Sequence, residues 1–544
     1  MDRPALPPTD RAAERAAERP SVARPDDHAP TLAIGLDIGS TFTKGALFRL
    51  GPGDPCLLRR AATPTTTAHL PDGAGTVIRH LLDLPPAWTW EDLPRTSLPS
   101  SVGAGDGQTS DEVRPLPPIH FTSSAKGGLR VAVVGLVPEL SVQIGRLVAW
   151  SAGARLTGTY SYRLTDSALA EIEQTRPDIV LWCGGTDGGH ERSGRENAQR
   201  LARSSYDGTL IYAGNALLAD EVRQTLAHKR LVVTANVMPE FGRFNGEPAR
   251  EAIRTIFLQT IVQGKGLDRL AALTGTEPVP TPRAMFDLVG AIADHCPDWR
   301  EFIAIDLGGA TTDVYSCAPA FRGGEGLRLR GLVEPERKRS VEGDLGLRIS
   351  ASALAAVLAG DDVPVTTVGL PPVTPTALAA WVERVGAHPE TLPASPEEEA
   401  ADAWLAAGCI RHALRRHAGR LEPVWLPEGQ VWVQTGKDLR PVPRLVLTGG
   451  YPAAHPRLPL FELAEPAARR APELLVPQAP RCFVDHLYLW PLLGPLVARF
   501  PAAAARLAVA SLTAVPAVAS CPDVPHTATT DKESHPCEIL SDSL

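Results

Sequence analysis

The most regular pattern of apolar and polar positions lies between residues 129 and 240. Short apolar runs of strand length alternate there with segments whose apolar residues recur every three or four positions, as in an amphipathic helix. The pattern predicts strands at residues 129–137, 156–162, 178–183, 209–213 and 231–234, with helices at 139–152, 166–175, 191–203 and 216–228. This alternation is typical of a doubly wound parallel α/β sheet, in which ligands and partners bind beyond the carboxyl ends of the strands.

A different pattern occurs twice outside this segment. An apolar run with β character ends at Asp306, a Gly308-Gly309 turn follows, and Thr311 and Thr312 lead into a second strand-like run. Residues 32–44 repeat the pattern, with Asp37 aligned to Asp306, Gly39 to Gly308 and Thr43 to Thr312. Each copy predicts a β-hairpin whose turn presents backbone N–H groups beside an aspartate.

The chemistry of these hairpins suits phosphate. Successive N–H groups in a glycine turn form an anion-binding nest. Asp37 and Asp306 cannot bind phosphate themselves, so they are predicted to hold Mg²⁺ through its waters. The other predicted binding residues of the hairpins are Gly39, Ser40, Thr41, Lys44, Gly308, Gly309, Thr311 and Thr312. One copy would fit an ordinary hairpin, but two copies favour a site that grips nucleotide phosphates from both sides. Lys44 either points at a phosphate or faces solvent.

The hairpins resemble the phosphate-1 and phosphate-2 loops of the superfamily of actin, sugar kinases and 70-kDa heat-shock ATPases. Residues 444–450, which end in Gly449-Gly450, fit the adenosine loop of that superfamily, and the three loops follow in its order. The resemblance implies a two-lobed actin-like ATPase fold with ribonuclease H-like lobes, and ATP and Mg²⁺ as cofactors. The 129–240 segment would then be an inserted doubly wound parallel α/β domain.

A wider set of segments resembles the glutamate mutase L (MutL) family, whose members are found beside adenosylcobalamin-dependent mutases. The segments are residues 37–44, 123–129, 134–139, 184–189, 213–215, 236–239, 306–313, 341–348 and 485–488, with Gly494. The resemblance runs from about residue 31 to 497. It implies an ATP-hydrolysing reactivating chaperone whose partners are mutase subunits. Pro491 departs from the family pattern and is expected to kink or shift the last helix.

Two other functions stay open on the residues alone. A small-molecule kinase needs an aspartate base beside the acceptor hydroxyl, and Asp187 could serve. A nucleotide-dependent structural protein is the second alternative, although the expected insertion and tails argue against close polymer packing.

Residues 184–189 place four glycines around Thr186 and Asp187. They predict either a close approach to a ligand, with Asp187 orienting the water in ATP hydrolysis, or a sharp strand-to-helix turn. Glu342 and Asp344 suit either a nucleotide or interdomain contact or the N-terminus of a helix. The basic residues between 411 and 417 are interpreted as a solvated helical face.

Composition narrows the class of protein. The 544 residues are 44% hydrophobic, which is enough for two or more domains with cores. A net charge of −8 argues against a general nucleic-acid or anionic-membrane surface. The eight cysteines form no Cys-x-x-Cys pair, which argues against a zinc site and favours a reducing compartment. Residues 1–30 have no signal-peptide pattern and no stretch spans a membrane, so we expect a soluble, cytoplasmic protein.

The same patterns divide the chain. Residues 1–30 are expected to be a disordered tail, 31–128 a first ATPase lobe with a disordered insertion at 97–118, and 129–240 the inserted domain. Residues 241–500 complete the ATPase lobes, with helices at 247–266, 350–358 and 399–417 and a proline-rich linker at 363–376. Residues 501–544 are expected to be a largely disordered C-terminal tail.

Overall fold

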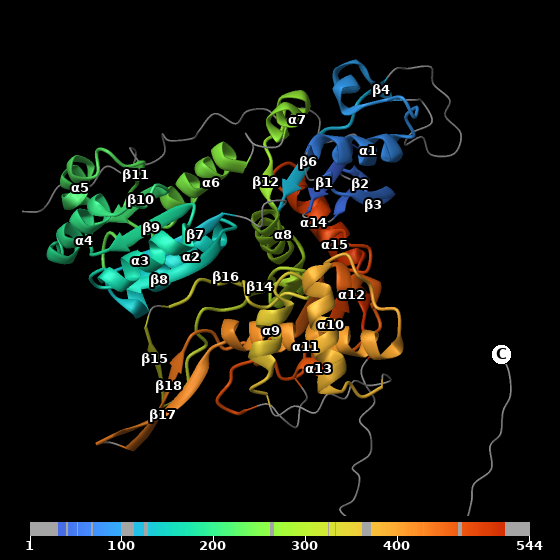
Figure 1. The fold of residues 1–544 in the computed structure, drawn as a ribbon. Coiled ribbons are helices and arrows are strands. Elements are labelled where there is room, and N and C mark those ends of the chain that lie inside the picture. The colour runs from blue at the N-terminus through green and yellow to red at the C-terminus, as the bar shows by residue number, and fades with distance from the viewer. Residues whose placement is uncertain are drawn as a thin grey trace, which may run out of the picture.

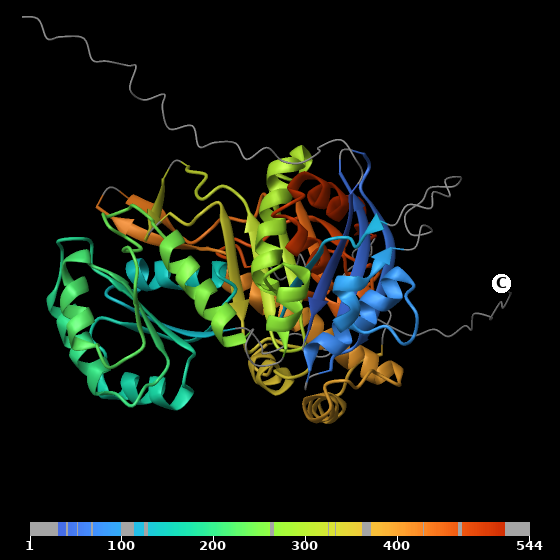
Figure 2. The same ribbon diagram turned by 90° about the horizontal axis from the view of Figure 1, so that it is seen from above.

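The computed structural model of the chain has the expected mixed α/β class. The structure describes residues 31–516 apart from 40–41, 52, 67–68, 99–113, 125–128, 262–265, 325, 332, 362–370, 428 and 466–470. The fold has three large sheets. Both views place helix α8 (Thr281–His295) between the sheet of the N-terminal hairpin and the sheet formed by strands of residues 130–233 (Figures 1 and 2). The predicted tail 1–30 lies outside the described residues.

The first sheet carries the N-terminal hairpin. Its strand order is β12-β6-β1-β2-β3. The strands are β1 (Thr31–Ile38), β2 (Phe42–Leu50), β3 (Cys56–Pro64), β6 (Ile119–Ser123) and β12 (Val279–Pro280). β1 is antiparallel to β2 and parallel to β6. Helix α1 (Leu70–Leu82) contacts β2 and β3, and it buries Val77, Ile78 and Leu81 against this sheet.

The second sheet repeats this arrangement around the other hairpin. Its order is β16-β14-β13-β19-β20-β21. The strands are β13 (Phe302–Leu307), β14 (Thr312–Cys317), β16 (Arg337–Glu342), β19 (Arg444–Thr448), β20 (Arg481–Val484) and β21 (Thr513–Ala514). β13 is antiparallel to β14 and parallel to β19, as β1 is antiparallel to β2 and parallel to β6. The two hairpins therefore have the same topological setting.

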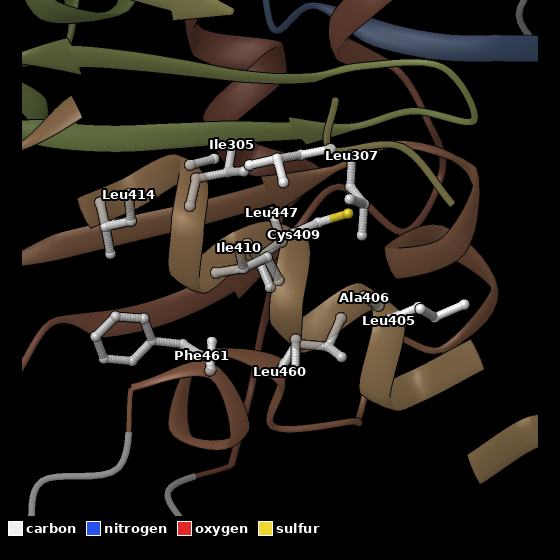
Figure 3. Close-up of a cluster of buried hydrophobic side chains, with 14 of the residues drawn as sticks. Ile305, Leu307, Leu405, Ala406, Cys409, Ile410, Leu414, Leu447, Leu460 and Phe461 are labelled. Atoms are coloured by element: carbon white, nitrogen blue, oxygen red, sulfur yellow. The ribbon is translucent and has the colours of Figure 1, made fainter. Parts of the chain in front are cut away.

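Helices cover the second sheet on both faces. Helix α11 (Pro396–His417) lays Cys409, Ile410 and Leu414 against Ile305 and Leu447 on one face (Figure 3). Helices α9 (Ala351–Leu358), α10 (Pro375–Ala387), α12 (Gly450–Ala454) and α13 (Leu460–Ala464) complete this layer. α10 begins inside the predicted linker 363–376, whose residues 363–370 lie outside the described residues, because Pro375 is tolerated in the first turn of a helix.

The prediction of a tail from residue 501 is wrong for residues 501–515. Helix α15 (Pro501–Ala510) packs along α8 and buries Ala504, Ala505 and Ala508, and β21 then pairs with β20. The alanine-rich sequence shows no clear amphipathic pattern, so periodicity does not predict this helix. The small alanine side chains allow it to pack closely on α8. Helix α14 (Trp490–Leu493) places Pro491 in its first turn, so that proline begins a helix. Residues 517–544 lie outside the described residues.

The third sheet confirms the strands and helices expected between 129 and 240. Its order is β11-β10-β9-β7-β8, and every pair is parallel. The strands are β7 (Arg130–Gly135), β8 (Arg155–Ser161), β9 (Ile179–Gly184), β10 (Thr209–Gly214) and β11 (Leu231–Val233). Helices α3 (Asp166–Thr175), α4 (Arg192–Arg203) and α5 (Ala219–Thr225) pack on one face.

The other face of the third sheet is covered in part by a helix that lies after the predicted domain boundary at residue 240. Helix α2 (Gln143–Ser151) covers it together with α6 (Glu247–Ile261), whose Ile253, Ile256 and Phe257 are buried. These residues share one core cluster with Ile34 and Leu36 of the first sheet. Helix α7 (Leu267–Thr274) follows and contacts α1. The unit around the third sheet is thus packed against the rest of the chain.

Two small sheets complete the fold. β15 (Leu327–Arg330), β17 (Arg420–Leu426) and β18 (Gly429–Thr435) form a projecting three-stranded sheet (Figure 1). β4 (Ser97–Leu98) and β5 (Arg114–Pro115) pair with each other. The predicted insertion 97–118 is therefore wrong at its ends, and its middle, residues 99–113, lies outside the described residues. None of the helices in the described part of the chain is long and apolar enough to cross a bilayer.

We expect residues 99–113 to be dispensable for folding. Their glycine-, serine- and charge-rich composition cannot bury a core, and the β4–β5 pair already holds the two ends together. Replacing them with a short Gly-Ser bridge should leave the melting temperature within about 2 °C of the parent chain. A clearly larger decrease in a thermal melt would show that the segment packs on the fold.

Candidate functional site

The two hairpins bring Asp37 and Asp306 into one electrostatic environment. Asp37 lies at the end of β1, opposite Lys44 on β2, and Asp306 lies near the end of β13, opposite Asp313 on β14. The charge of Asp37 acts on the Asp306 carboxyl, and Lys44 acts on it with the opposite sign. The two hairpins, which come from separate parts of the sequence, therefore lie close together. Lys44 stands opposite the aspartate in the first hairpin, and Asp313 stands at the matching position in the second.

Asp37 is fixed by three hydroxyl donors from distant parts of the chain. Its Oδ1 accepts hydrogen bonds from Thr122 Oγ1 at 2.9 Å and Thr281 Oγ1 at 2.9 Å. Its Oδ2 accepts from the Tyr488 hydroxyl at 3.2 Å. All three donors are neutral and Asp37 is buried, so the carboxylate is held in one orientation while its charge remains available to a cation.

Lys44 points into the site rather than to solvent. Its ammonium nitrogen lies 3.3 Å from the centroid of the Tyr488 ring. Burial lowers the pKa of Lys44 below its usual value, although Asp37, Asp306 and Asp485 oppose this shift. Of the two interpretations left open by the sequence, the geometry favours the one in which Lys44 can meet an anionic ligand.

Asp306 differs from Asp37 in its lack of donors. Among the residues that the structure describes, none donates a hydrogen bond to its carboxylate, and the side chain is partly buried. Burial, together with the charges of Asp313 and Asp37, raises the pKa of Asp306 to about 7, against the opposing effect of Lys44. Asp306 is therefore the carboxyl in this site that gains most from a positive charge or a proton.

This asymmetry predicts that Asp306→Asn stabilises the protein without ligand. A pKa raised from 3.8 to about 7 means that ionised Asp306 lowers the stability of the fold at pH above 7, with the penalty fading as the pH falls toward 4. The amide removes the penalty, so the free energy of unfolding should rise by about 2 kcal/mol at pH 8, after allowance for partial exposure, and hardly change at pH 4.

Thermal melts at pH 8 and pH 4 measure this effect, and Asp485→Asn is the matched control. Burial also raises the pKa of Asp485, but its carboxylate accepts from Thr448 Oγ1, Leu489 N and Trp490 N, which oppose that shift. Its amide variant loses an acceptor for these donors and should melt lower than the parent. Equal behaviour of the two variants would contradict the difference that we assign to Asp306.

The turn of the second hairpin is supported from behind by residues 343–350. Arg348 N and Ile349 N donate to Gly309 O at 2.8 Å each, and Ser350 Oγ donates to Ala310 O at 2.7 Å. Gly308 N closes the turn on Thr311 O at 3.0 Å, and Gly39 N does the same with Phe42 O at 3.1 Å in the first hairpin. The N–H groups of Gly308 and Gly39 thus serve the turns themselves.

The predicted hydroxyl donors of the second hairpin have partners inside the protein. Thr312 is fully buried, and its Oγ1 donates to Leu345 O at 2.7 Å. Thr311 Oγ1 donates to Asp313 Oδ2 at 3.2 Å. Their predicted role as ligand donors remains a prediction, as does that of Ser40 and Thr41, which lie outside the described residues.

The predicted adenosine loop lies beside the second hairpin. Thr448 pairs with Asp306 in the parallel β13–β19 ladder, and Gly449 and Gly450 follow directly. Gly449 has φ 115°, and a side chain there would come within 2.3 Å of Leu307 O, so only glycine fits. A side chain at Gly450 would meet nothing within 4 Å, which leaves that side of the loop open to a ligand.

Asp187 does not join this group of residues. It lies beyond β9 in the third sheet, where its Oδ1 accepts from Asn236 Nδ2 at 2.9 Å and Ala216 N at 2.8 Å. Gly188 N is bonded to Asn215 Oδ1, and Gly189 N to Thr186 O. The 184–189 loop is therefore a strand-to-helix turn held by hydrogen bonds to Asn215, Ala216 and Asn236, and a water-orienting role for Asp187 stays a prediction.

Sequence reasoning missed the residues that connect the site to its surroundings. Asp313, next to the hairpin turn, pairs with buried Arg339 at 2.5 Å. Arg416 pairs with Glu342 at 2.8 Å and with Asp344 at 2.7 Å, so those carboxylates hold α11. The interpretation of residues 411–417 as a solvated face is wrong, since Arg411 and His417 are buried. The burial of these charged residues depends on ion pairs and hydrogen bonds with residues far away in the sequence, and hydrophobic periodicity cannot show such contacts.

Comparisons with known proteins agree with the resemblance. A sequence model described as MutL protein matches residues 33–512. A protein named MutL from Clostridium tetanomorphum is 34% identical over 406 residues, which cover 71% of this chain and 84% of that protein. Nucleotide-free acetone carboxylase is similar at 12% identity, with 86% of this chain and 70% of that chain covered and a TM-score of 0.34. A glycerol dehydratase reactivase is similar at 13% identity, with 86% and 99% covered and a TM-score of 0.29. TM-scores below 0.5 do not establish a shared fold.

Proposed function

The chain belongs to the MutL protein family, and from this premise we propose that it is an ATP-binding and ATP-hydrolysing accessory protein of an adenosylcobalamin-dependent mutase such as glutamate mutase. The observation that carries the proposal is the meeting of Asp37, Lys44 and Asp306 between two hairpins of matching topology. Phosphates of ATP would lie between the turns, with Lys44 as their cation and Gly449-Gly450 beside the adenosine.

The arrangement of the sheets supports a two-lobed actin-like ATPase. Each hairpin sheet has three antiparallel strands followed by parallel ones, as in β3-β2-β1-β6-β12 and β16-β14-β13-β19-β20. Helices α8, α14 and α15 fill a common core between these sheets. Movement of one sheet relative to the other around bound nucleotide is the mechanical step that we assign to the protein.

The residues present fit Mg²⁺ held mainly through water. Asp37 and Asp306 supply carboxylate oxygens in one electrostatic environment, which suits a magnesium ion that keeps its waters and binds phosphate oxygens. When bound, Mg²⁺ would neutralise charge on the phosphates. Asp37 and Asp306 would orient the waters, and the partly buried Asp306 could also accept a proton from an attacking water.

We place the contact with the mutase on the third sheet, at the carboxyl ends of its strands. Large apolar side chains are exposed in the segments that follow β8, β10 and β11, at Tyr162, Leu217, Phe241 and Phe244, with exposed fractions between 46% and 77%. Of these, Tyr162 lines a pocket that also includes Trp182 and His190. Exposed apolar groups beyond the carboxyl ends of strands are typical of a protein contact surface. Closure of the sheets would move this end of the third sheet and help to release a damaged cofactor.

The test is a titration of the full chain with the mutase in ATP and in ADP, with single variants at the sheet edge. Nucleotide should change the affinity for the mutase at least about fivefold. Phe241→Ser and Leu217→Ser should weaken binding about tenfold, while Trp425→Ser, equally exposed on β17, should not. Absence of binding in both nucleotides would contradict the accessory function, and an effect confined to Trp425→Ser would move the contact to the projecting sheet.

A further inference from the structure

Residues 485–488 form a bridge from the second sheet to the first hairpin. They follow β20 directly and lead into α14. Asp485 is fully buried and ties the bridge to the second sheet through Thr448 Oγ1 at 3.0 Å. It also fixes the start of α14 by accepting from Leu489 N at 2.8 Å and Trp490 N at 3.0 Å. The position of Tyr488 is thereby set by the strand that carries the adenosine loop.

Tyr488 adopts a backbone conformation that its side chain does not favour. Its φ is 53°, in the left-handed region that residues other than glycine, asparagine and aspartate seldom occupy. The hydrogen bond from Tyr488 N to Asp485 O at 3.0 Å and the contacts of the half-buried side chain with Asp37 and Lys44 hold it there. This conformation directs the ring across the boundary between the two sheets, toward β1 and β2.

The two ends of the tyrosine side chain meet two different groups of the first hairpin. The hydroxyl donates to Asp37 Oδ2 at 3.2 Å, and the face of the ring lies 3.3 Å from Lys44 Nζ. Burial and the nearby charge of Asp37 raise the pKa of Tyr488 well above its usual value, so the hydroxyl remains a donor at any physiological pH. A cation over an aromatic face in a desolvated site is strongly held.

We propose that Tyr488 is the positioning residue that prepares the first hairpin for nucleotide from the side of the second sheet. Its ring holds the Lys44 ammonium at the phosphate position, and its hydroxyl holds the Asp37 carboxylate at the cation position. This inference rests on the proposed nucleotide site and adds a coupling to it: the strand that contacts adenosine sets the geometry of the groups that contact phosphate and cation.

Two variants separate the roles of the ring and the hydroxyl. Tyr488→Phe keeps the ring beneath Lys44 and removes the donor to Asp37. Tyr488→Asn removes both, and asparagine tolerates the left-handed backbone at this position. Calorimetric titration of ATP without Mg²⁺ reports the Lys44 contact, and the Mg²⁺ concentration for half-maximal hydrolysis at saturating ATP reports Asp37. Thermal melts check whether both variants are folded.

We expect a division between the two readouts. Tyr488→Asn should weaken Mg²⁺-free ATP binding about tenfold, whereas Tyr488→Phe should change it less than twofold. Both should raise the half-maximal Mg²⁺ concentration about fivefold. In a Lys44→Met background, Tyr488→Asn should weaken ATP binding no further, because the ring acts through Lys44. If Tyr488→Asn does not fold, Tyr488→His replaces it in the Lys44→Met comparison, because histidine also tolerates this backbone. Tyr488→Phe then tests the hydroxyl as before.

Equal effects of Tyr488→Phe and Tyr488→Asn on ATP binding, or no effect of either on both readouts, would overturn the positioning role. If the parent chain binds ATP and the Tyr488 variants give the same values as the parent in both readouts, only this inference is wrong. A parent chain that binds no nucleotide defeats the proposed function, and this inference with it.

Discussion

Asp306→Ala is expected to lower the rate of Mg²⁺-dependent ATP hydrolysis by a factor of about 100 or more, with the fold intact. Asp306 is influenced by the charges of Asp37 and Lys44, has no donor among the described residues, and has its pKa raised to about 7. Its charge is therefore not needed to hold neighbouring groups, and its loss removes an anion that orients cation-bound water. Steady-state phosphate release at saturating Mg²⁺ measures the effect.

Asp187→Ala is the control for this prediction. Asp187 lies beside the third sheet and bonds to Asn236 and Ala216, so hydrolysis should persist in this variant. A loss equal to that of Asp306→Ala would instead support the water-orienting role predicted from sequence. Hydrolysis by Asp306→Ala at the rate of the parent chain would remove Asp306 from the site.

Asp313→Ala is expected to destabilise the protein by about 3–5 kcal/mol, because it leaves a buried arginine without its anion. Asp313 Oδ1 accepts from Arg339 Nε at 3.0 Å and Nη2 at 2.5 Å, and the Arg339 side chain is 1% exposed. The third nitrogen of this guanidinium, Nη1, donates to Trp150 O at the end of α2. The pair thus joins the second hairpin to the helix that covers the third sheet.

Chemical denaturation of three chains tests this prediction. Asp313→Leu with Arg339→Met removes both charges and keeps apolar volume, so the double variant should be more stable than Asp313→Ala. If Asp313→Ala unfolds at the same denaturant concentration as the parent chain, the buried pair does not have the structural weight that we give it. Loss of the pair should also weaken any response of the third sheet to nucleotide.

Local pattern predicted much of this fold. The strands and helices between 129 and 240 follow from alternating periods, and helix α3 has the predicted ends, since Thr165 caps it and its apolar residues recur regularly. The paired Asp37 and Asp306 hairpins follow from repetition of a short glycine-rich pattern. In each of these cases the signal lies within about ten consecutive residues.

The features that sequence did not show depend on contacts between distant residues. α15 is alanine-rich and is recognisable as a helix only from its packing on α8. Tyr488 stands out in the sequence only as part of a family segment, because its partners Asp37 and Lys44 lie more than 400 residues earlier. The burial of Asp313, Arg339 and Arg411 depends on which charges the fold brings together, and hydrophobic periodicity carries no information on such pairs.

The most direct test of the central claim, that both hairpins form one Mg²⁺-nucleotide site, is a calorimetric titration of ATP into the full chain with and without Mg²⁺. We predict one ATP per chain, with Mg²⁺ tightening the binding, and loss of this Mg²⁺ effect in both Asp37→Asn and Asp306→Asn. Loss in only one of the variants, or ATP binding that neither substitution changes, would contradict a site shared by the two hairpins.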